Sequence, residues 1–188
     1  MEDYFENALF GTPFTAAVIV AAGSSQRMGG EDKQFIELCG KPVLARSMAA
    51  FQHCPIIEEI VVVTKPSSVE AVRKMAEKYG IDKLKAVVEG GASRAESVRN
   101  GVEAVSAAAE FVAIHDGARP LVTPKDITRC ADDAFRCGGA VLAVPVTDTV
   151  KYGRKNGFVE YTPARDQLFA AHTPQIFDRE IYRSAMER

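Results

Sequence analysis

Short apolar runs alternate along the chain with segments in which apolar residues recur every three or four positions. The runs are Ala16–Ala22, Ile57–Thr64, Lys85–Val88, Phe111–His115 and Ala140–Val146. Several are almost continuously apolar, which is typical of parallel strands that are covered on both faces. The pattern therefore predicts five strands of one largely buried sheet.

The segments between these runs predict amphipathic helices. Their apolar stripes are Leu44, Met48 and Phe51; Val69, Val72, Ala76 and Tyr79; Ala95, Val98, Val102 and Val105; and Ile127, Ala131 and Ala134. Ser67, with Glu70 three residues later, has the pattern of a capping box. Thr123 before Pro124 predicts an N-cap and a first helical residue, and Asp178 predicts the cap of a last helix.

This order of strands and helices predicts the α/β class, with a Rossmann-like, doubly wound and mostly parallel sheet. Ligands of such sheets bind beyond the carboxyl ends of the strands. Chemistry is therefore expected in the loops that follow Ala22, Val88, His115 and Val146. Residues 1–14 are expected to be a poorly ordered lead-in, and residues 15–188 to form one domain.

The sequence pattern of apolar runs and amphipathic segments changes after Val146. Two short segments flank the turn-rich stretch Gly153–Gly157, whose Asn156-Gly157 pair favours a hairpin. The hairpin interrupts the α/β order, so it is expected to project as an arm spanning about residues 147–176. Such an arm either contacts a second subunit or is a solvated hairpin, and the sequence leaves both open.

Composition narrows the function classes. The chain has 188 residues, 47% of them hydrophobic, and a net charge of −2 with both signs interleaved. It predicts a soluble protein without a basic patch for nucleic acid or an anionic membrane. No apolar stretch approaches the roughly 20 residues that span a bilayer. The four cysteines form no CxxC pair, which is typical of reduced thiols in a cytoplasmic protein.

The loop after the first run reads AAGSSQRMGGEDKQ at residues 21–34. Gly23, Ser24 and Ser25 have little bulk, so their amides can approach an oxyanion, and Arg27 and Lys33 add two cations. Together these groups can hold a triphosphate; the alternative is a flexible glycine turn with two surface cations. The loop matches neither dinucleotide-binding nor P-loop patterns.

Two further loops carry candidate chemistry. Residues 90–101 read GGASRAESVRNG, where a helix starting near Arg94 can receive a base carbonyl or an anion, or is an ordinary helix start. Residues 115–120 read HDGARP. Asp116, at the end of a central strand, is well placed to bind Mg²⁺, although it can also be a turn residue. Arg119 binds a substrate phosphate or pairs with Asp116. His115 is expected to be a packed residue behind the site rather than a ligand.

These motifs resemble the 2-C-methyl-D-erythritol 4-phosphate cytidylyltransferases. The resemblance runs from about Ala17 to the end of the chain, through AAG, R-M-G, K-Q, GG-x-x-R-x-x-SV, HDGARP and TPQ. It implies Mg²⁺-dependent transfer of a cytidylyl group from CTP to this polyol phosphate in non-mevalonate isoprenoid synthesis, without an organic cofactor. The alternatives are the same chemistry on ribitol 5-phosphate and a non-catalytic CTP-binding module.

The resemblance also implies roles for individual residues. Catalytic charge stabilisation falls to Arg27 and Lys33; the nucleotide is held by Ala21, Ala22, Gly23, Ser24, Gly91, Ala92 and Ser97; the metal by Asp116; and the acceptor by Arg119, Thr149, Arg165 and Thr173. Arg165 and Thr173 would reach the acceptor across a homodimer interface, carried by the exchanged arm. The acceptor phosphate is itself nucleophilic, so no Ser-His pair is expected.

The sequence departs from the family pattern in two places. Val20 stands where the family often has proline, a minor change within a strand. Family members also continue for some tens of residues beyond the last predicted helix, with a final strand and an acceptor-binding lysine. The chain ends at Arg188, so it is expected to be truncated relative to them.

Overall fold

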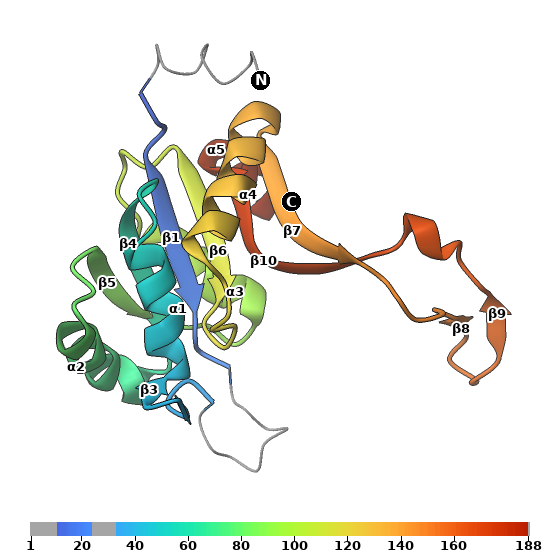
Figure 1. The fold of residues 1–188 in the computed structure, drawn as a ribbon, viewed down its shortest axis with the longest axis horizontal. Helices are drawn as coiled ribbons and strands as arrows, with labels where there is room; N and C mark the ends of the chain where they lie inside the picture. The colour runs from blue at the N-terminus through green and yellow to red at the C-terminus, as the bar shows by residue number, and fades with distance from the viewer. Residues whose placement is uncertain (1–10, 24–32, 188) are drawn as a thin grey trace.

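A six-stranded sheet with the order β5-β4-β1-β6-β10-β7 forms the centre of the computed structural model, which describes residues 11–23 and 33–187 (Figure 1). The strands are β1 (Thr15–Val20), β4 (Ile57–Thr64), β5 (Leu84–Glu89), β6 (Phe111–Asp116), β7 (Gly139–Pro145) and β10 (Phe169–Asp178). The first four run parallel, whereas β10 is antiparallel to both β6 and β7. The predicted α/β sheet is therefore confirmed, with one antiparallel strand inserted.

Helices cover both faces of this sheet. α1 (Val43–Gln52), α2 (Val69–Tyr79) and α4 (Pro124–Cys137) share one core with Ala17 and Ile19 of β1. On the other face, α3 (Arg94–Glu103) packs against Ala16 and Val18, and Tyr182 of α5 (Arg179–Met186) joins this second core. Neighbouring residues of β1 thus point into opposite cores, which explains why the run is apolar without interruption.

The predicted helix caps are correct in two places and wrong in one. Thr123 and Asp126 form a capping box with Pro124 in the first turn, and Asp178 accepts hydrogen bonds from the amides of Glu180 and Ile181. The capping box at Ser67 is absent. Residues Pro66–Ser68 instead form a 3₁₀ turn, η3, and α2 begins after Ser68 without a side-chain cap. A proline suits the first position of such a turn, so helical structure starts before the expected cap.

Strand β10 was not predicted, and it lies between β6 and β7 in the sheet. Its sequence FAAHTPQIFD carries a proline and four polar side chains, which obscure the strand pattern. The register with β7 shifts between Ala171 and Gln175, and this irregularity accommodates Pro174. A small hairpin of β2 (Glu37–Leu38) and β3 (Lys41–Pro42), also unpredicted, precedes α1.

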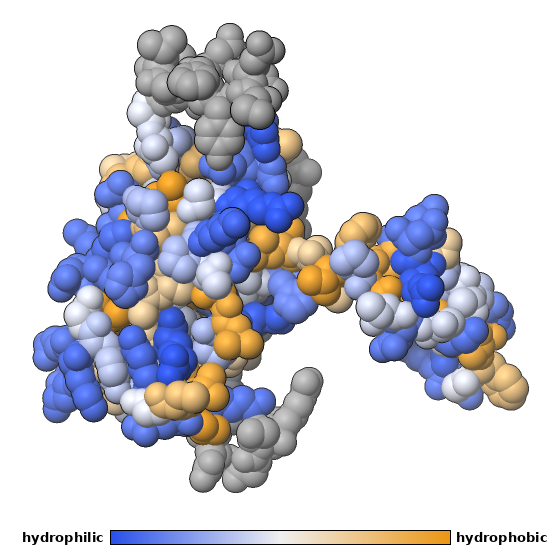
Figure 2. Space-filling model, viewed as in Figure 1, coloured by the Kyte–Doolittle hydropathy of each residue, from blue (hydrophilic) through white to orange (hydrophobic). Residues whose placement is uncertain are grey.

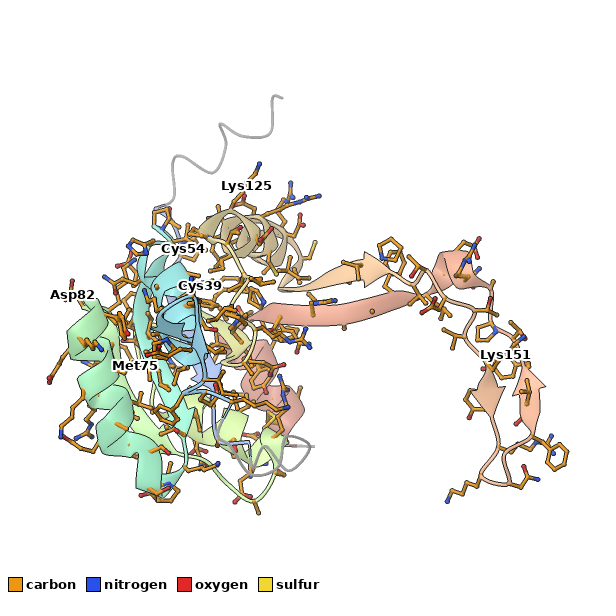
Figure 3. All side chains as sticks on the ribbon, turned by 60° about the horizontal axis from the view of Figure 1, so that its bottom comes forward. Cys39, Cys54, Met75, Asp82, Lys125 and Lys151 are labelled. Atoms are coloured by element: carbon orange, nitrogen blue, oxygen red, sulfur yellow. The ribbon has the colours of Figure 1, made fainter. Side chains whose placement is uncertain are left out.

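Between β7 and β10 the chain leaves the body as an arm, residues 146–168 (Figures 1 and 3). The arm contains β8 (Tyr152–Gly153), β9 (Val159–Tyr161) and a 3₁₀ turn, η4 (Arg165–Gln167). Gly157 has φ +86°, which fits the predicted turn. The arm is shorter than predicted, because β10 begins at Phe169 and its final four residues pair with β6.

Candidate active site

The site lies where the strand order reverses. From β1 the chain passes to β4 and β5 on one side of the sheet and then returns to β6 on the other. Loops that follow β1 and β6 therefore diverge and leave a crevice at the carboxyl ends of these strands. A cleft of about 780 Å³ occupies this position, between the loop after β1, the start of α3 and the loop after β6.

The loop after β1 forms one wall of the cleft. The amide of Ala21 donates to the carbonyl of Val63 at 2.7 Å, which extends the strand pairing by one residue. A Cβ atom on Gly90 would lie 2.3 Å from the Cβ of Ala22, so only glycine allows the two loops to approach this closely. Ala22, Gly23 and Lys33 line the cleft. Ser24 and Arg27, also predicted for this loop, lie outside the described residues.

The first turn of α3 forms the second wall. The buried hydroxyl of Ser97 accepts a hydrogen bond from the amide of Gly91 at 3.1 Å and donates to the carbonyl of Ser93 at 2.8 Å. The carboxylate of Glu96 accepts from the amide of Ala92 at 2.8 Å. Gly91, Ala92 and Ser97 therefore come together as predicted for base binding, but side chains of the helix already hold the two amides.

Asp116 lies at the end of β6 between two arginines. Its Oδ1 accepts from Arg94 Nη2 at 2.8 Å, and its Oδ2 accepts from Arg119 Nε at 3.1 Å. Burial alone raises the pKa of Asp116, but the hydrogen bonds and charges of Arg94 and Arg119 outweigh burial and lower the pKa below its ordinary value. The carboxylate is therefore ionised at neutral pH, with one net positive charge in the trio.

His115 is fully buried directly beneath this ion pair. Its Nε2 lies 3.1 Å from the carbonyl oxygen of Arg119, its Nδ1 lies 3.0 Å from Thr173 Oγ1, and its ring packs on Phe51. Burial lowers the pKa of His115 to about 4, although the Arg119 carbonyl and the charge of Asp116 favour the protonated form. The ring is therefore neutral at physiological pH.

The residues predicted to bind the acceptor are divided between body and arm. Arg119 lines the cleft, and the Thr173 hydroxyl accepts from the amide of Asp116 at 3.2 Å. The expectation that the arm carries Thr173 to another subunit is wrong, because Thr173 belongs to β10 and is 6% exposed in its own body. Thr149 and Arg165 are exposed in the arm, and Arg165 Nη1 donates to the carbonyl of Thr147 at 2.9 Å.

Two residues of the site had no predicted role. Arg94 binds Asp116, and its position in the GG-x-x-R motif was the available indication. His172 accepts a hydrogen bond from Arg119 Nη1 at 3.0 Å. Its neighbour in the sequence is Thr173, but its position depends on β10 being a strand.

No helix among the residues that the structure describes is long and apolar enough to cross a membrane.

Comparison with known proteins gives a consistent result. The family model for 2-C-methyl-D-erythritol 4-phosphate cytidylyltransferase matches residues 15–188. The enzyme of that name from Dehalococcoides mccartyi strain CBDB1 is 41% identical over 172 residues, which are 92% of this chain and 75% of the relative. The corresponding protein of Alkaliphilus oremlandii is 42% identical over 169 residues, 89% of this chain and 72% of the relative.

Solved structures agree with this assignment. The crystal structure of 4-diphosphocytidyl-2C-methyl-D-erythritol synthase from Anaerococcus prevotii superposes with a TM-score of 0.85 at 28% identity. The superposition covers 96% of this chain and 77% of that structure. The Thermus thermophilus 2-C-methyl-D-erythritol 4-phosphate cytidylyltransferase gives a TM-score of 0.70, also at 28% identity, over 93% of this chain and 75% of that one.

Proposed function

The chain belongs to the 2-C-methyl-D-erythritol 4-phosphate cytidylyltransferase family, whose activity is CTP-dependent cytidylyl transfer in isoprenoid biosynthesis, and we propose how its own residues divide that work. The observation that carries the proposal is the convergence of Lys33, Arg94 and Arg119 with Asp116 on one cleft at the switch point of the sheet. Its volume of about 780 Å³ lies within the range of small-molecule sites, about 300–1,000 Å³.

The nucleotide would lie between the loop after β1 and the start of α3. Gly23 leaves room for a phosphate to approach the backbone, and Lys33 supplies a positive charge at the same wall. Ser24 and Arg27 belong to this phosphate loop in the proposal. The base would lie beside Gly91, Ala92 and Ser97. Because Glu96 and Ser97 already hold the loop amides, base binding would start from a loop that is ordered in advance.

In the reaction, an oxygen of the acceptor phosphate attacks the α-phosphorus of CTP. A new phosphorus–oxygen bond forms, the bond from the α-phosphorus to the β-phosphate oxygen breaks, and pyrophosphate leaves. The acceptor is already an anion, so the protein needs no base and acts by positioning and by stabilising charge. Lys33 and Arg27 would stabilise the charge that develops at the transferred phosphoryl group, and Arg119 would orient the acceptor.

Asp116 is the described residue that fits Mg²⁺ binding. Its Oδ1 accepts from both Nε and Nη2 of Arg94, whereas its Oδ2 accepts from Arg119 Nε and keeps lone-pair capacity for a cation. Among residues 11–23 and 33–187 there is no group of three acidic, histidine or cysteine side chains that could enclose a metal. One carboxylate is nevertheless appropriate when substrate phosphates and water provide the remaining ligands. When bound, Mg²⁺ would offset phosphate charge.

A second copy of the chain would complete the acceptor side. A hollow of about 750 Å³ lies between α4, β7 and the loop after β6, and it shares Arg119 with the nucleotide cleft. The arm carries exposed apolar side chains, including Phe158 at 72% exposure, that a partner could cover. We therefore place Thr149 and Arg165 of one copy at the acceptor site of the other, which makes the homodimer the active form.

The test is pyrophosphate release from CTP with Mg²⁺, measured with 2-C-methyl-D-erythritol 4-phosphate and with ribitol 5-phosphate in parallel. We expect turnover with the first acceptor and little with the second. The reverse preference would reassign the acceptor. Isothermal titration with CTP is the control: CTP binding without turnover on either acceptor would contradict the catalytic proposal and favour a binding module.

A further inference from the structure

We infer that His115 is a positioning residue, which fixes Asp116 and Arg119 through a directed chain of hydrogen bonds. The inference rests on the proposed function for its kinetic consequence, since Asp116 and Arg119 are the metal-binding and acceptor-binding residues of that proposal. His115 itself is fully buried and does not line the cleft, so it acts through its neighbours.

The direction of each hydrogen bond follows from the donors and acceptors that take part, with the ring of His115 neutral. His115 Nε2 lies 3.1 Å from the carbonyl oxygen of Arg119, and a carbonyl oxygen only accepts, so Nε2 carries the ring proton. In the neutral ring, Nδ1 is then an acceptor. Thr173 Oγ1, 3.0 Å from Nδ1, must donate its hydroxyl proton to it. The same oxygen accepts from the amide of Asp116 at 3.2 Å.

The chain joins three segments that meet at the cleft. His115 and Asp116 end β6, Thr173 belongs to the neighbouring strand β10, and Arg119 lies in the loop after β6. Packing fixes the ring further, because its centroid lies 5.0 Å from that of Phe51 and Thr173 is itself 6% exposed. The bonds to Arg119 and Asp116 are to backbone atoms, so His115 sets the positions from which both side chains reach the cleft.

This arrangement changes the role predicted for Thr173. Its one hydroxyl proton is used in the bond to His115. The hydroxyl therefore has no proton to donate to an acceptor phosphate while that hydrogen bond is in place. Thr173 then supports the site by holding the amide of Asp116. His115 and Thr173 act as one unit, and their substitutions should not have additive effects.

The tautomer can be measured without any assay of activity. In the ¹⁵N-histidine-labelled chain, long-range ¹H–¹⁵N spectra at neutral pH distinguish a protonated Nε2 from a protonated Nδ1. His53 is an internal control of the opposite kind, because its Nδ1 lies 2.7 Å from the carbonyl oxygen of Ala49 and therefore carries the proton. We expect the Nε2–H form at His115 and the Nδ1–H form at His53. A protonated Nδ1 at His115 would overturn the inference.

Substitution tests the kinetic consequence. His115→Phe keeps a ring but removes both hydrogen bonds, and should lower kcat about 10- to 100-fold with CTP affinity nearly unchanged. His115→Asn, whose side-chain oxygen can still accept from Thr173, should lose less. The exposed control His53→Phe should retain wild-type kcat. A kcat for His115→Phe within about twofold of wild type, in a chain that binds CTP, would overturn the positioning role.

A double-mutant cycle tests whether His115 and Thr173 act as one hydrogen-bonded unit. Thr173→Val removes the hydroxyl at nearly constant volume, and combined with His115→Phe it should cost little more than the larger single effect. Fully additive losses of kcat would contradict the proposed chain of hydrogen bonds. If wild-type protein shows no turnover, the proposed function has failed, whereas the tautomer measurement still decides the hydrogen-bond chain. If His115→Phe does not fold, the kinetics of His115→Asn and the tautomer measurement still test the inference.

Discussion

The cleft and the arm are built on opposite principles. At the cleft, the side chains of Asp116 and Arg119 find hydrogen-bond partners within the same protein chain, and so does the buried side chain of His115 next to them. In the arm, large apolar side chains face outward: Phe158 is 72% exposed and Val159 58% exposed, and the stacked pair Tyr152 and Tyr161 is 53% exposed at each ring. Figure 2 shows hydrophobic residues both where the arm leaves the body and toward its far end.

The difference separates two tasks. A pre-formed hydrogen-bond network is ready for a small ligand before the ligand arrives, because the cost of ordering has been met during folding. An exposed apolar arm is stabilised only when another surface covers it, because burying apolar area is what lowers its free energy. Substitutions in the body should therefore change turnover and folding, and substitutions in the arm should change acceptor use and association.

The largest effect is expected from the charge at the cleft. Lys33→Ala should lower kcat about 10²- to 10³-fold while CTP affinity changes much less, because in the proposed mechanism the lysine acts mainly on charge that develops in the transition state. Single-turnover kinetics and CTP titration separate the two. Lys74→Ala, at a lysine of α2 whose side chain is 72% exposed, is the control. A loss confined to KM would assign Lys33 to ground-state binding.

Acid should destabilise the body next most strongly. The folded-state pKa of His115 is about 4, below its ordinary value of 6.5, so the unfolded chain binds a proton more readily between these values. The stabilising contribution is complete above about pH 6.5 and is lost as pH falls toward 4, about 2 kcal/mol between pH 7 and pH 5. The lowered pKa of Asp116, which faces Arg94 and Arg119, acts in the same direction at lower pH.

Urea unfolding at several pH values measures this loss. The His115→Asn chain is the matched control, because it has no ring to titrate and its free energy of unfolding should change less over the same interval. An equal change in both chains would show that His115 does not cause it.

An arm residue should affect the acceptor alone. Arg165→Ala should raise the KM for the acceptor about 10-fold and leave CTP affinity nearly unchanged, because Arg165 lies in the arm and not at the nucleotide cleft. Co-expression of Arg165→Ala with Lys33→Ala chains in equal amounts provides a sharper test. Half of the dimers would be mixed, each with one intact site. At an acceptor concentration well below KM, where Arg165→Ala dimers contribute little, about a quarter of wild-type turnover should return. No recovery would contradict a site shared between chains.

The smallest effect concerns association. Phe158→Ser should weaken dimerisation about 10-fold by sedimentation, because a large aromatic ring would be removed from the interface. The unfolding free energy of the separated chain should change little, since that ring is exposed in the single chain. Ile181→Ser, at an apolar residue of α5 that is 58% exposed on the body, is the control. Equal weakening by both variants would argue against the arm as the contact.

Most of the parallel sheet could be predicted because the apolar runs of its strands directly indicate burial on both faces. The run from Ala16 through Val20 is apolar at every position, and both of its faces are covered. Strand β10 could not be predicted in the same way, because His172, Thr173 and Pro174 interrupt its apolar pattern and lie where its register with β7 shifts. The helix caps at Thr123 and Asp178 were visible, since a cap is a local hydrogen bond.

The loops that form the site could be predicted from the sequence, but most of the hydrogen bonds between its residues could not. Asp116 and Arg119 lie three residues apart in the motif HDGARP, and their pairing was one of two alternatives for Arg119. Thr173 lies 57 residues from Asp116 along the chain, so their bond depends on where β10 enters the sheet. The importance of His115 depends on that same long-range placement, which no local motif encodes.

The position of β10 also determines the order in which the chain can assemble. Within the described residues, β7 pairs with β10 and with no other strand, while β10 in turn pairs with β6. A ribosome that has released residue 145 has therefore made β7 before the strand that joins it to the sheet exists. The β6 edge must wait through synthesis of residues 146–168. Late, long-range pairing of this kind is slow in protein folding, and here it falls on the strand that supports Asp116.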